Sequence, residues 1–368
     1  MLKAYKYRLY PNKEQKEQIS KTFGCCRFVY NQMLAKRIND YKQENKSMSK
    51  IDMNNYCNRV MKKEFEWLKE VDKCALTNSI YNLDEAYKNF FRRIKQGQGV
   101  EFPKFKSKKN RRNSYKTNFT NGNIKVDFTN NKIQLPKLKW IKAKVHREFV
   151  GVIKSATISQ TPSGKYFVSI LVDTENVQLP KLETKVGIDL GLKDFAITSD
   201  GEVFDNPKWL RKQELKLKKA QRNLSRKKKD SKNREKARIK VAKIHEKIAN
   251  QRKDYLHKIS SYITNENQVI VIEDLKVSNM MGNHKLAKAI GEVSWYEFRT
   301  MLEYKCEWKG RELIIAPTNY ASSQLCSNCG NKSTQTKDLS CRTYTCEKCG
   351  MILDRDINAS KNLLKLAM

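Results

Sequence analysis

Four cysteines near the C-terminal end of the sequence have the spacing of a metal site. Cys326 and Cys329 lie in LCSNCG, Cys346 and Cys349 lie in YTCEKCG, and 16 residues separate the two pairs. A glycine follows each pair, as a turn with positive φ favours. The spacing predicts one tetrahedral zinc ion held by four thiolates. Because four thiolates leave no coordination position open, this zinc would fold a small module and would not catalyse.

Acidic residues occur at three predicted regular elements that lie far apart in the sequence. Asp189 ends an apolar strand predicted at 185–189, and Glu273 follows the β-branched run 269–272. Asp356 lies at the start of a short predicted helix. Asp189 alone would be interpreted as a loop cap, but three carboxylates on rigid elements are typical ligands of Mg²⁺. Two such ions about 4 Å apart clamp the attacking and leaving oxygens of a phosphodiester, which predicts nuclease chemistry.

The charge of the chain indicates a polyanionic partner. The 368 residues contain 75 Lys and Arg against 39 Asp and Glu, a formal net charge of +36. Such an excess repels itself unless a polyanion neutralises it, which favours nucleic acid over a merely soluble basic protein. No run of about 18 apolar residues predicts a membrane span, and the N-terminal residues lack the apolar core of a signal peptide.

Patterns of hydrophobic residues indicate the elements that must position these groups. Residues 208–258 are dominated by Lys and Arg, with Leu and Ile at helical spacing, and predict a basic helical hairpin that turns near 229–233. A solvated pair of charged helices is the alternative. Residues 11–95 have a helical pattern, with Asn12 and Asp72 as candidate N-caps. Residues 115–180 alternate apolar and polar side chains and predict a β-barrel, which the initial strand would join.

A basic linker is expected at 96–114, between the helices and the barrel. The aromatic residues in and beside it could stack on bases or pack in a core, and the sequence does not separate these roles: Phe102, Phe105 and Tyr115. The six cysteines without ligand spacing are expected to pack as small hydrophobes: Cys25, Cys26, Cys57, Cys74, Cys306 and Cys341.

Taken together, the motifs resemble those of a known family over nearly the whole chain. GIDLGLKDFAITSDG, IEDLKVSNM, CSNCG with YTCEKCG, and DRDINASKNL are similar, in this order, to the three RuvC motifs and inserted zinc ribbon of TnpB. That family comprises transposon-encoded RNA-guided nucleases related to the type V CRISPR effectors. MLKAYKYRLYPNKEQ, LDEAYKNFF, FPKFKSKKN and HKLAKAIGEVSWYEFRTMLEYK resemble the same family.

The resemblance implies a fold that combines α/β, all-β and all-α parts. A ribonuclease H-like RuvC domain would carry the zinc ribbon, and a helical recognition insert would interrupt an N-terminal β-barrel, the wedge domain. The expected boundaries are 1–10 and 115–180 for the wedge, 11–95 for the recognition insert, 96–114 for the linker, 181–321 and 351–368 for RuvC with its hairpin at 207–262, and 322–350 for the ribbon.

The resemblance also implies the roles of the site residues. Asp189, Glu273 and Asp356 match the catalytic acids and would hold Mg²⁺, expected as two ions, whereas Asp274 and Asp354 would be neighbours that form hydrogen bonds or face solvent. The four paired cysteines would hold one structural zinc. Family members read a short motif beside their target, and the residues expected to contact its bases are Asn78, Tyr81, Thr117 and Asn118.

The function implied is an RNA-guided DNA endonuclease of a transposable element. Its partners would be a structured guide RNA and double-stranded target DNA, with no membrane, in a prokaryotic cytoplasm and at the nucleoid when bound to DNA. The four histidines are scattered, so one RuvC site would cut both strands: His146, His245, His257 and His284. Two alternatives stay open, a guide-independent RuvC-like nuclease or transposase and a non-cleaving RNA-guided repressor. The intact acids argue against the repressor.

Overall fold

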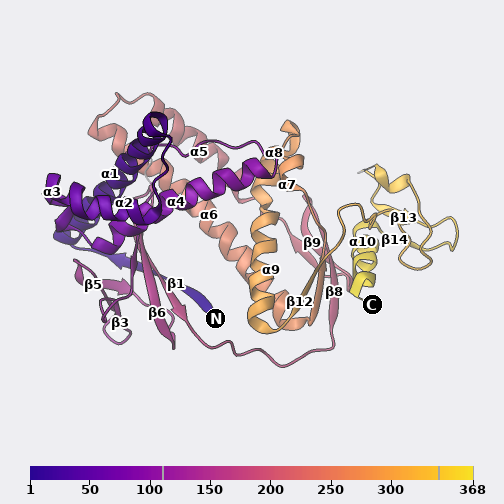
Figure 1. The fold of residues 1–368 in the computed structure, drawn as a ribbon. Coiled ribbons are helices and arrows are strands. Elements are labelled where there is room, and N and C mark those ends of the chain that lie inside the picture. The colour runs from indigo at the N-terminus through magenta and orange to yellow at the C-terminus, as the bar shows by residue number, and fades with distance from the viewer. Residues whose placement is uncertain (110–111, 339, 368) are drawn as a thin grey trace. The chain divides into compact units, whose positions relative to one another are not determined.

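The chain forms two compact units, Met1–Glu175 and Asn176–Met368 (Figure 1). The computed structural model describes residues 1–109, 112–338 and 340–367. No helix within these residues has the length and apolar character needed to cross a membrane. Helices and sheets occur in both units, as the mixed fold class predicts.

A seven-stranded sheet organises the first unit. Its order is β2-β6-β7-β1-β5-β4-β3, and the N-terminal strand β1 pairs antiparallel with β7 and β5. Alternate side chains are buried as the sequence pattern predicts, for example Val168, Ile170 and Val172 of β7. The strands are β1 Leu2–Tyr10, β2 Asn113–Asn118, β3 Lys125–Asp127, β4 Lys132–Leu135, β5 Lys139–Lys144, β6 Val152–Gln160 and β7 Tyr166–Asp173. The closure of this sheet as a barrel remains a prediction, as do the domain boundaries.

The chain between β1 and β2 is helical for most of its length as far as Lys95. The helices are α1 Lys13–Glu44, α2 Lys50–Tyr56, α3 Lys62–Glu64 and α4 Lys73–Lys95, with short π and 3-10 turns at Cys57–Met61 and Glu66–Glu70. Both predicted N-caps are confirmed. Asn12 forms a capping box with Gln15, and Asp72 accepts hydrogen bonds from the N–H groups of Cys74 and Ala75.

A five-stranded sheet forms the centre of the second unit. Its order is β10-β9-β8-β11-β12, with β8, β11 and β12 parallel and β9 and β10 antiparallel. The strands are β8 Lys185–Leu190, β9 Asp194–Thr198, β10 Val203–Asp205, β11 Val269–Ile272 and β12 Glu312–Ile315. The central strand β11 is a continuous apolar run because helices cover both faces of the sheet.

Two groups of helices pack on opposite faces of this sheet. On one face, Ile188 and Ile272 share a core with Leu256 of α6 and Phe298 of α9. On the other face, Val271 packs with Leu363 of α10. The helices of the unit are α5 Trp209–Ser225, α6 Lys232–Glu266, α7 Val277–Met280, α8 His284–Val293, α9 Trp295–Lys309 and α10 Arg355–Leu364.

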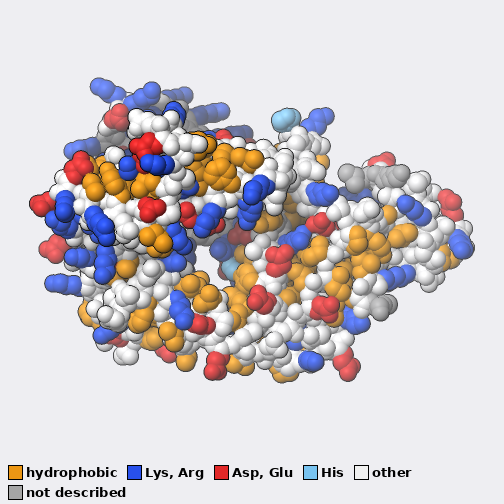
Figure 2. Space-filling model, in the orientation of Figure 1, with side chains coloured by type: hydrophobic (Ala, Val, Ile, Leu, Met, Phe, Trp, Pro, Cys, Tyr) orange, Lys and Arg blue, Asp and Glu red, His pale blue; other side chains and the backbone are white. Residues whose placement is uncertain are grey.

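Helices α5 and α6 form the basic hairpin, with the turn at 226–231. Leu217, Ala220, Ile244 and Ile248 make its small core. Lys and Arg side chains cover this hairpin at the upper edge of the view in Figure 2. One leucine of the hairpin differs from the prediction. Leu215 is among the leucines at helical spacing that were expected on the apolar face, but its side chain is 83% exposed.

Candidate metal centres

Strand alternation places Asp189 and Glu273 on the same face of the sheet. In β8, Val186 and Ile188 point into the core with α6 and α9, so Asp189 points to the opposite face. Glu273 directly follows β11, in which Ile270 and Ile272 point into the same core. Because β8 and β11 are parallel neighbours with Ile188 opposite Ile272, the two acids also lie next to each other along the sheet edge.

Helix α10 packs closely on this face and carries Asp356 in its first turn (Figure 1). The close packing depends on Gly187 of β8. A Cβ atom at this position would clash with the carbonyl oxygen of Ser360 and would lie 2.6 Å from the backbone nitrogen of Leu364. A glycine in a buried strand is therefore what allows the helix to bring Asp356 toward the other two acids.

Asp354 is the N-cap of α10. Its Oδ1 accepts hydrogen bonds from the backbone N–H groups of Asp356, at 2.9 Å, and Ile357, at 3.1 Å. Asp274 is also occupied, because it accepts hydrogen bonds from Arg299, at 2.6 Å, and Thr318, at 2.9 Å. Both residues thus form hydrogen bonds as neighbours of the site.

The electrostatics of Asp189 and Glu273 favour a cation. Burial raises the pKa of Asp189 well above its ordinary value, and the nearby charges of Glu273 and Asp356 raise it further. Burial likewise raises the pKa of Glu273, although the hydroxyl of Ser322 donates a 2.6 Å hydrogen bond to its carboxylate and opposes the shift. Carboxyl groups that repel one another in a buried place are the hard oxygen donors that a divalent metal neutralises.

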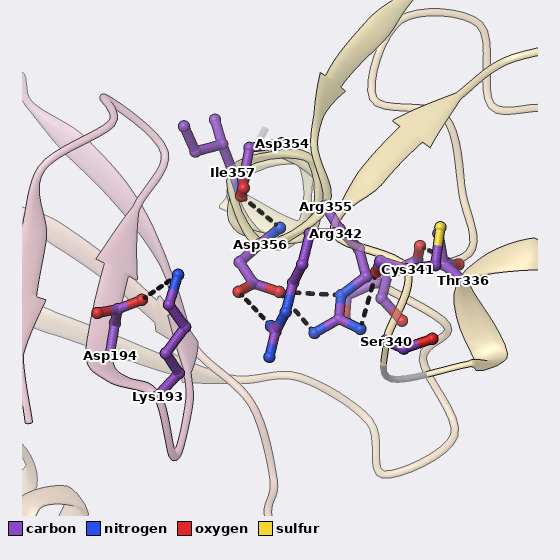
Figure 3. Close-up of polar contacts among 12 residues, drawn as sticks. Lys193, Asp194, Thr336, Ser340, Cys341, Arg342, Asp354, Arg355, Asp356 and Ile357 are labelled. Atoms are coloured by element: carbon purple, nitrogen blue, oxygen red, sulfur yellow. Dashed lines mark hydrogen bonds and ion pairs between the residues drawn. The ribbon is translucent and has the colours of Figure 1, made fainter.

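Asp356 is neutralised by two arginines instead. Its carboxylate lies 2.8 Å from Arg355 and 3.2 Å from Arg342, and both guanidinium groups point toward it in Figure 3. Across the described residues, the three carboxylates do not form a cluster as tight as the one formed by the paired cysteines. A metal ion at this site would compete with the arginines for Asp356. Nothing in the sequence distinguished Arg342 among 75 Lys and Arg.

The paired cysteines form one compact cluster. The Sγ atoms of Cys326, Cys329, Cys346 and Cys349 all lie within 4.8 Å of one another, and two of the Sγ pairs are 3.6 Å apart. The edge of a tetrahedron with Zn–S bonds of about 2.3 Å is roughly 3.8 Å. Backbone N–H groups of Cys349 and Lys348 lower the pKa of Cys346 to about 6, despite desolvation. The cluster therefore fits a zinc ion.

Two equivalent turns present the thiols. In the first, Gly330 donates its N–H to the carbonyl of Cys326, and in the second, Gly350 donates to Cys346, each at 2.9 Å. Both glycines have positive φ, 74° and 70°, as the sequence predicts. The small strands β13 Thr343–Thr345 and β14 Ile352–Asp354 pair beside these turns.

Two buried asparagines attach this cysteine-bearing segment to α10. Asn358 donates a 2.7 Å hydrogen bond to the carbonyl of Leu325 and accepts one of 2.9 Å from the N–H of Ser327. Asn362 donates to the carbonyls of Ser322, at 2.8 Å, and Leu325, at 2.6 Å. Sequence analysis missed both residues. Their spacing of four residues, which places both side chains on one face of a helix, was the available signal.

The four residues expected to contact bases differ in how far their side chains are exposed to solvent. Asn78 is buried and donates hydrogen bonds to the carbonyls of Cys74 and Lys116, and its amide also lies 3.3 Å from Oδ1 of Asn118. Thr117 is fully buried, whereas Tyr81 is 41% exposed. The structure thus brings Asn78 and Asn118 together where α4 meets β2. A base contact by any of the four remains a proposal.

Family models match three parts of the chain. A model described as "Probable transposase" matches residues 168–284, and one described as "Cas12f1-like, TNB domain" matches residues 295–363. A model described as "Helix-turn-helix domain" matches residues 1–46. In the structure, these last residues form the strand β1 and the single long helix α1, so the description does not fit their conformation.

Curated relatives match along nearly the full length. A protein of Streptomyces pristinaespiralis that carries the name RNA-guided DNA endonuclease is 38% identical over 98% of this chain and 88% of its own. InsQ of Escherichia coli K12, whose name contains the same words, is 35% identical over 99% of this chain and 92% of its own. Among solved structures, the mini RNA-guided endonuclease CRISPR-Cas phi3 matches with a TM-score of 0.54 at 10% identity, covering 100% of this chain and 92% of that one.

Proposed function

The chain belongs to the TnpB family, and from this premise we propose that it is a transposon-associated RNA-guided DNA endonuclease with its nuclease site at Asp189, Glu273 and Asp356. The observation that carries the site assignment is the arrangement of β8, β11 and α10. Strand alternation and the close approach of α10 at Gly187 direct acids from three distant segments to one face of the sheet.

The three acids would hold Mg²⁺, expected as two ions. Bound Mg²⁺ would supply activation of water and stabilisation of the charge on the phosphodiester. Residues of the chain itself hold the acids in place. Ser322 fixes the carboxylate of Glu273, and Asp354 fixes the first turn of α10. Arg342 and Arg355 supply positive charge to Asp356. With a cation held by the acids, Arg342 and Arg355 would be available to donate hydrogen bonds to a phosphate.

We assign cleavage of both DNA strands to this single site, beside a short recognition motif. Asn78, Tyr81, Thr117 and Asn118 stay our candidates for reading the motif. Tyr81 and Asn118 are the accessible pair, and Asn78 and Thr117 would support them from the buried side. The basic hairpin of α5 and α6 offers a surface for nucleic-acid backbone, because its cations outnumber its acids.

Guide exchange tests the function directly. A structured RNA should copurify with the full chain, and sequencing should identify it. Replacing its terminal guide segment is expected to redirect cleavage to the matching DNA next to the recognition motif, because base pairing would supply the sequence specificity. The measurement is the position of the cuts on two target plasmids.

Two outcomes would favour the alternatives. If RNA-free protein cuts the same DNA at the same place, the chain is a guide-independent nuclease. If the guided complex binds its matched DNA in Mg²⁺ and leaves it uncut, the chain is a guided repressor. The motif itself can be varied on the same plasmids.

We also propose that the four paired cysteines hold one structural zinc ion. Metal analysis of the purified chain should find about one zinc per chain. Cys346→Ser is expected to lower the zinc content and the melting temperature, since thiolate ligation is linked to folding. Cys341→Ser is the matched control, because the Cys341 thiol donates to the carbonyl of Thr343 and stands outside the cluster. Equal zinc loss in both variants would refute this ligand set.

A further inference from the structure

A cavity of about 450 Å³ lies within the first unit, whereas the residues of both metal centres belong to the second. Its walls come from α1, from α4, from the basic segment at 105–107 and from the start of β2. The volume falls in the range of about 300–1,000 Å³ that small-ligand sites occupy. One wall is rigid, because the ring of Tyr115 packs edge-on against Phe23 with 5.7 Å between ring centres.

The lining of this cavity is cationic. Arg27, Lys106, Arg112 and Lys116 contribute to it, and no acidic residue does so in the described part of the chain. Arg27, Lys106 and Lys116 form no ion pair with any described carboxylate. Cations gathered without counter-charges repel one another, so an anion bound between them would be stabilised.

Contacts with α1 hold Lys106 at the wall of the cavity. Its backbone N–H donates a 2.8 Å hydrogen bond to Oδ1 of Asn31, and its carbonyl accepts one of 3.0 Å from the same side chain. Its ammonium group lies 4.0 Å from the centre of the Tyr30 ring. Desolvation lowers the pKa of this lysine, an effect that a bound anion would oppose.

Uncommitted polar groups complete the lining. The side chains of Asn82, Asn113 and Ser114 form no hydrogen bond with any described residue, although all three line the cavity. Amide and hydroxyl groups of this kind can pair with a base edge or a sugar hydroxyl. Cations beside free amides and an aromatic wall match the chemistry of a nucleotide more closely than that of a bare phosphate ion.

We propose that this cavity binds one unpaired nucleotide, with its phosphate on Lys106 and Arg27 and its base against Asn82 and Ser114. The proposal rests on the proposed function, which supplies the nucleic acid. The carbonyl of Lys116 accepts the hydrogen bond from Asn78, so the cavity adjoins a candidate motif-reading residue. An unpaired nucleotide of RNA and one of DNA share this chemistry, and the two arms of the experiment separate them.

The experiment uses the full chain with Glu273→Gln, so that target DNA stays intact. One arm measures the Kd of the RNA-free protein for the copurifying structured RNA. The other arm measures the Kd of the RNA-loaded complex for guide-matched DNA, and both arms are repeated over a salt series. Lys106→Ala is expected to raise the Kd about tenfold in the arm that supplies the nucleotide, because a hydrogen-bonded charge is lost. It should also reduce the salt slope by about one.

Lys104→Ala is the matched control. Lys104 is an exposed lysine two residues before Lys106 that pairs with Glu101 at 2.6 Å and does not line the cavity. Arg27→Gln is a second test variant, and melting temperatures verify that each variant folds. If Lys106→Ala and Arg27→Gln both bind like Lys104→Ala in both arms, the nucleotide site is overturned. If the protein with Arg27 and Lys106 unchanged binds neither the structured RNA nor guide-matched DNA, the proposed function is refuted, and the nucleotide site is refuted with it.

Discussion

Replacing Glu273 with Gln is expected to reduce guided DNA cleavage by at least about 100-fold while binding of the target DNA survives. Glutamine keeps the shape of the side chain and can still accept the hydrogen bond from Ser322. It removes the negative charge that a divalent metal needs. Cleavage of a labelled target in Mg²⁺ and binding by filter assay measure the two effects separately.

Stability gives this variant an independent readout. Burial and the charge of Asp356 raise the pKa of Glu273, so the folded state disfavours its charged form. A carboxyl with a raised folded pKa costs stability as pH increases above its ordinary value, because the unfolded chain ionises more readily. Without metal at neutral pH, Glu273→Gln is therefore expected to melt no lower than the wild type. A lower melting temperature would indicate a structural role for the carboxylate.

The two aspartates of α10 provide a matched pair for the same test. Asp356→Asn is expected to lose cleavage like Glu273→Gln. Asp354→Asn should stay within a few-fold of wild type, because Asn is as good an N-cap as Asp and keeps the oxygen that accepts from the N–H groups of Asp356 and Ile357. Equal loss in both variants would contradict the assignment of Asp356 over Asp354.

The elements that carry the acids were predictable because each one is a short apolar run with a distinct end. The strand predicted at 185–189 is observed at Lys185–Leu190, and the one predicted at 269–272 is observed at Val269–Ile272. The cysteine cluster was predictable for a similar reason, since two local turns determine the directions of four thiols. Local patterns were sufficient in both places.

Contacts between distant segments were not predictable from one sequence. Arg342 and Asp356 are 14 residues apart and meet only through the fold of the cysteine-bearing segment, in a chain where basic residues are everywhere. Asn358 and Asn362 are polar residues of a short helix, yet both are buried and donate hydrogen bonds to carbonyls that precede the first cysteine pair. Thr117 is buried because β2 turns its side chain inward.

Gly187 carries the second large prediction, because it sets the distance between α10 and the sheet. Gly187→Ala is expected to lower the melting temperature by about 5 °C or more, as overpacking a core costs about 1–3 kcal/mol. The new Cβ would meet backbone atoms of Ser360 and Leu364, which cannot swing aside as a flexible side chain would. Cleavage should fall about 100-fold or more, since a displacement of Asp356 by roughly 1 Å misaligns the site. Thermal melting and cleavage kinetics measure the two effects.

Gly291→Ala separates this packing effect from the general effect of removing a glycine. Gly291 lies in α8 of the same unit, and a Cβ there would meet only the Cε of Met281, at 3.8 Å, an ordinary contact. Alanine also favours a helix over glycine by about 1 kcal/mol. Gly291→Ala should therefore melt at or above the wild-type temperature and cleave normally. If Gly187→Ala behaves in the same way, α10 can recede from β8 without loss of function, and the close approach at Gly187 does not position Asp356.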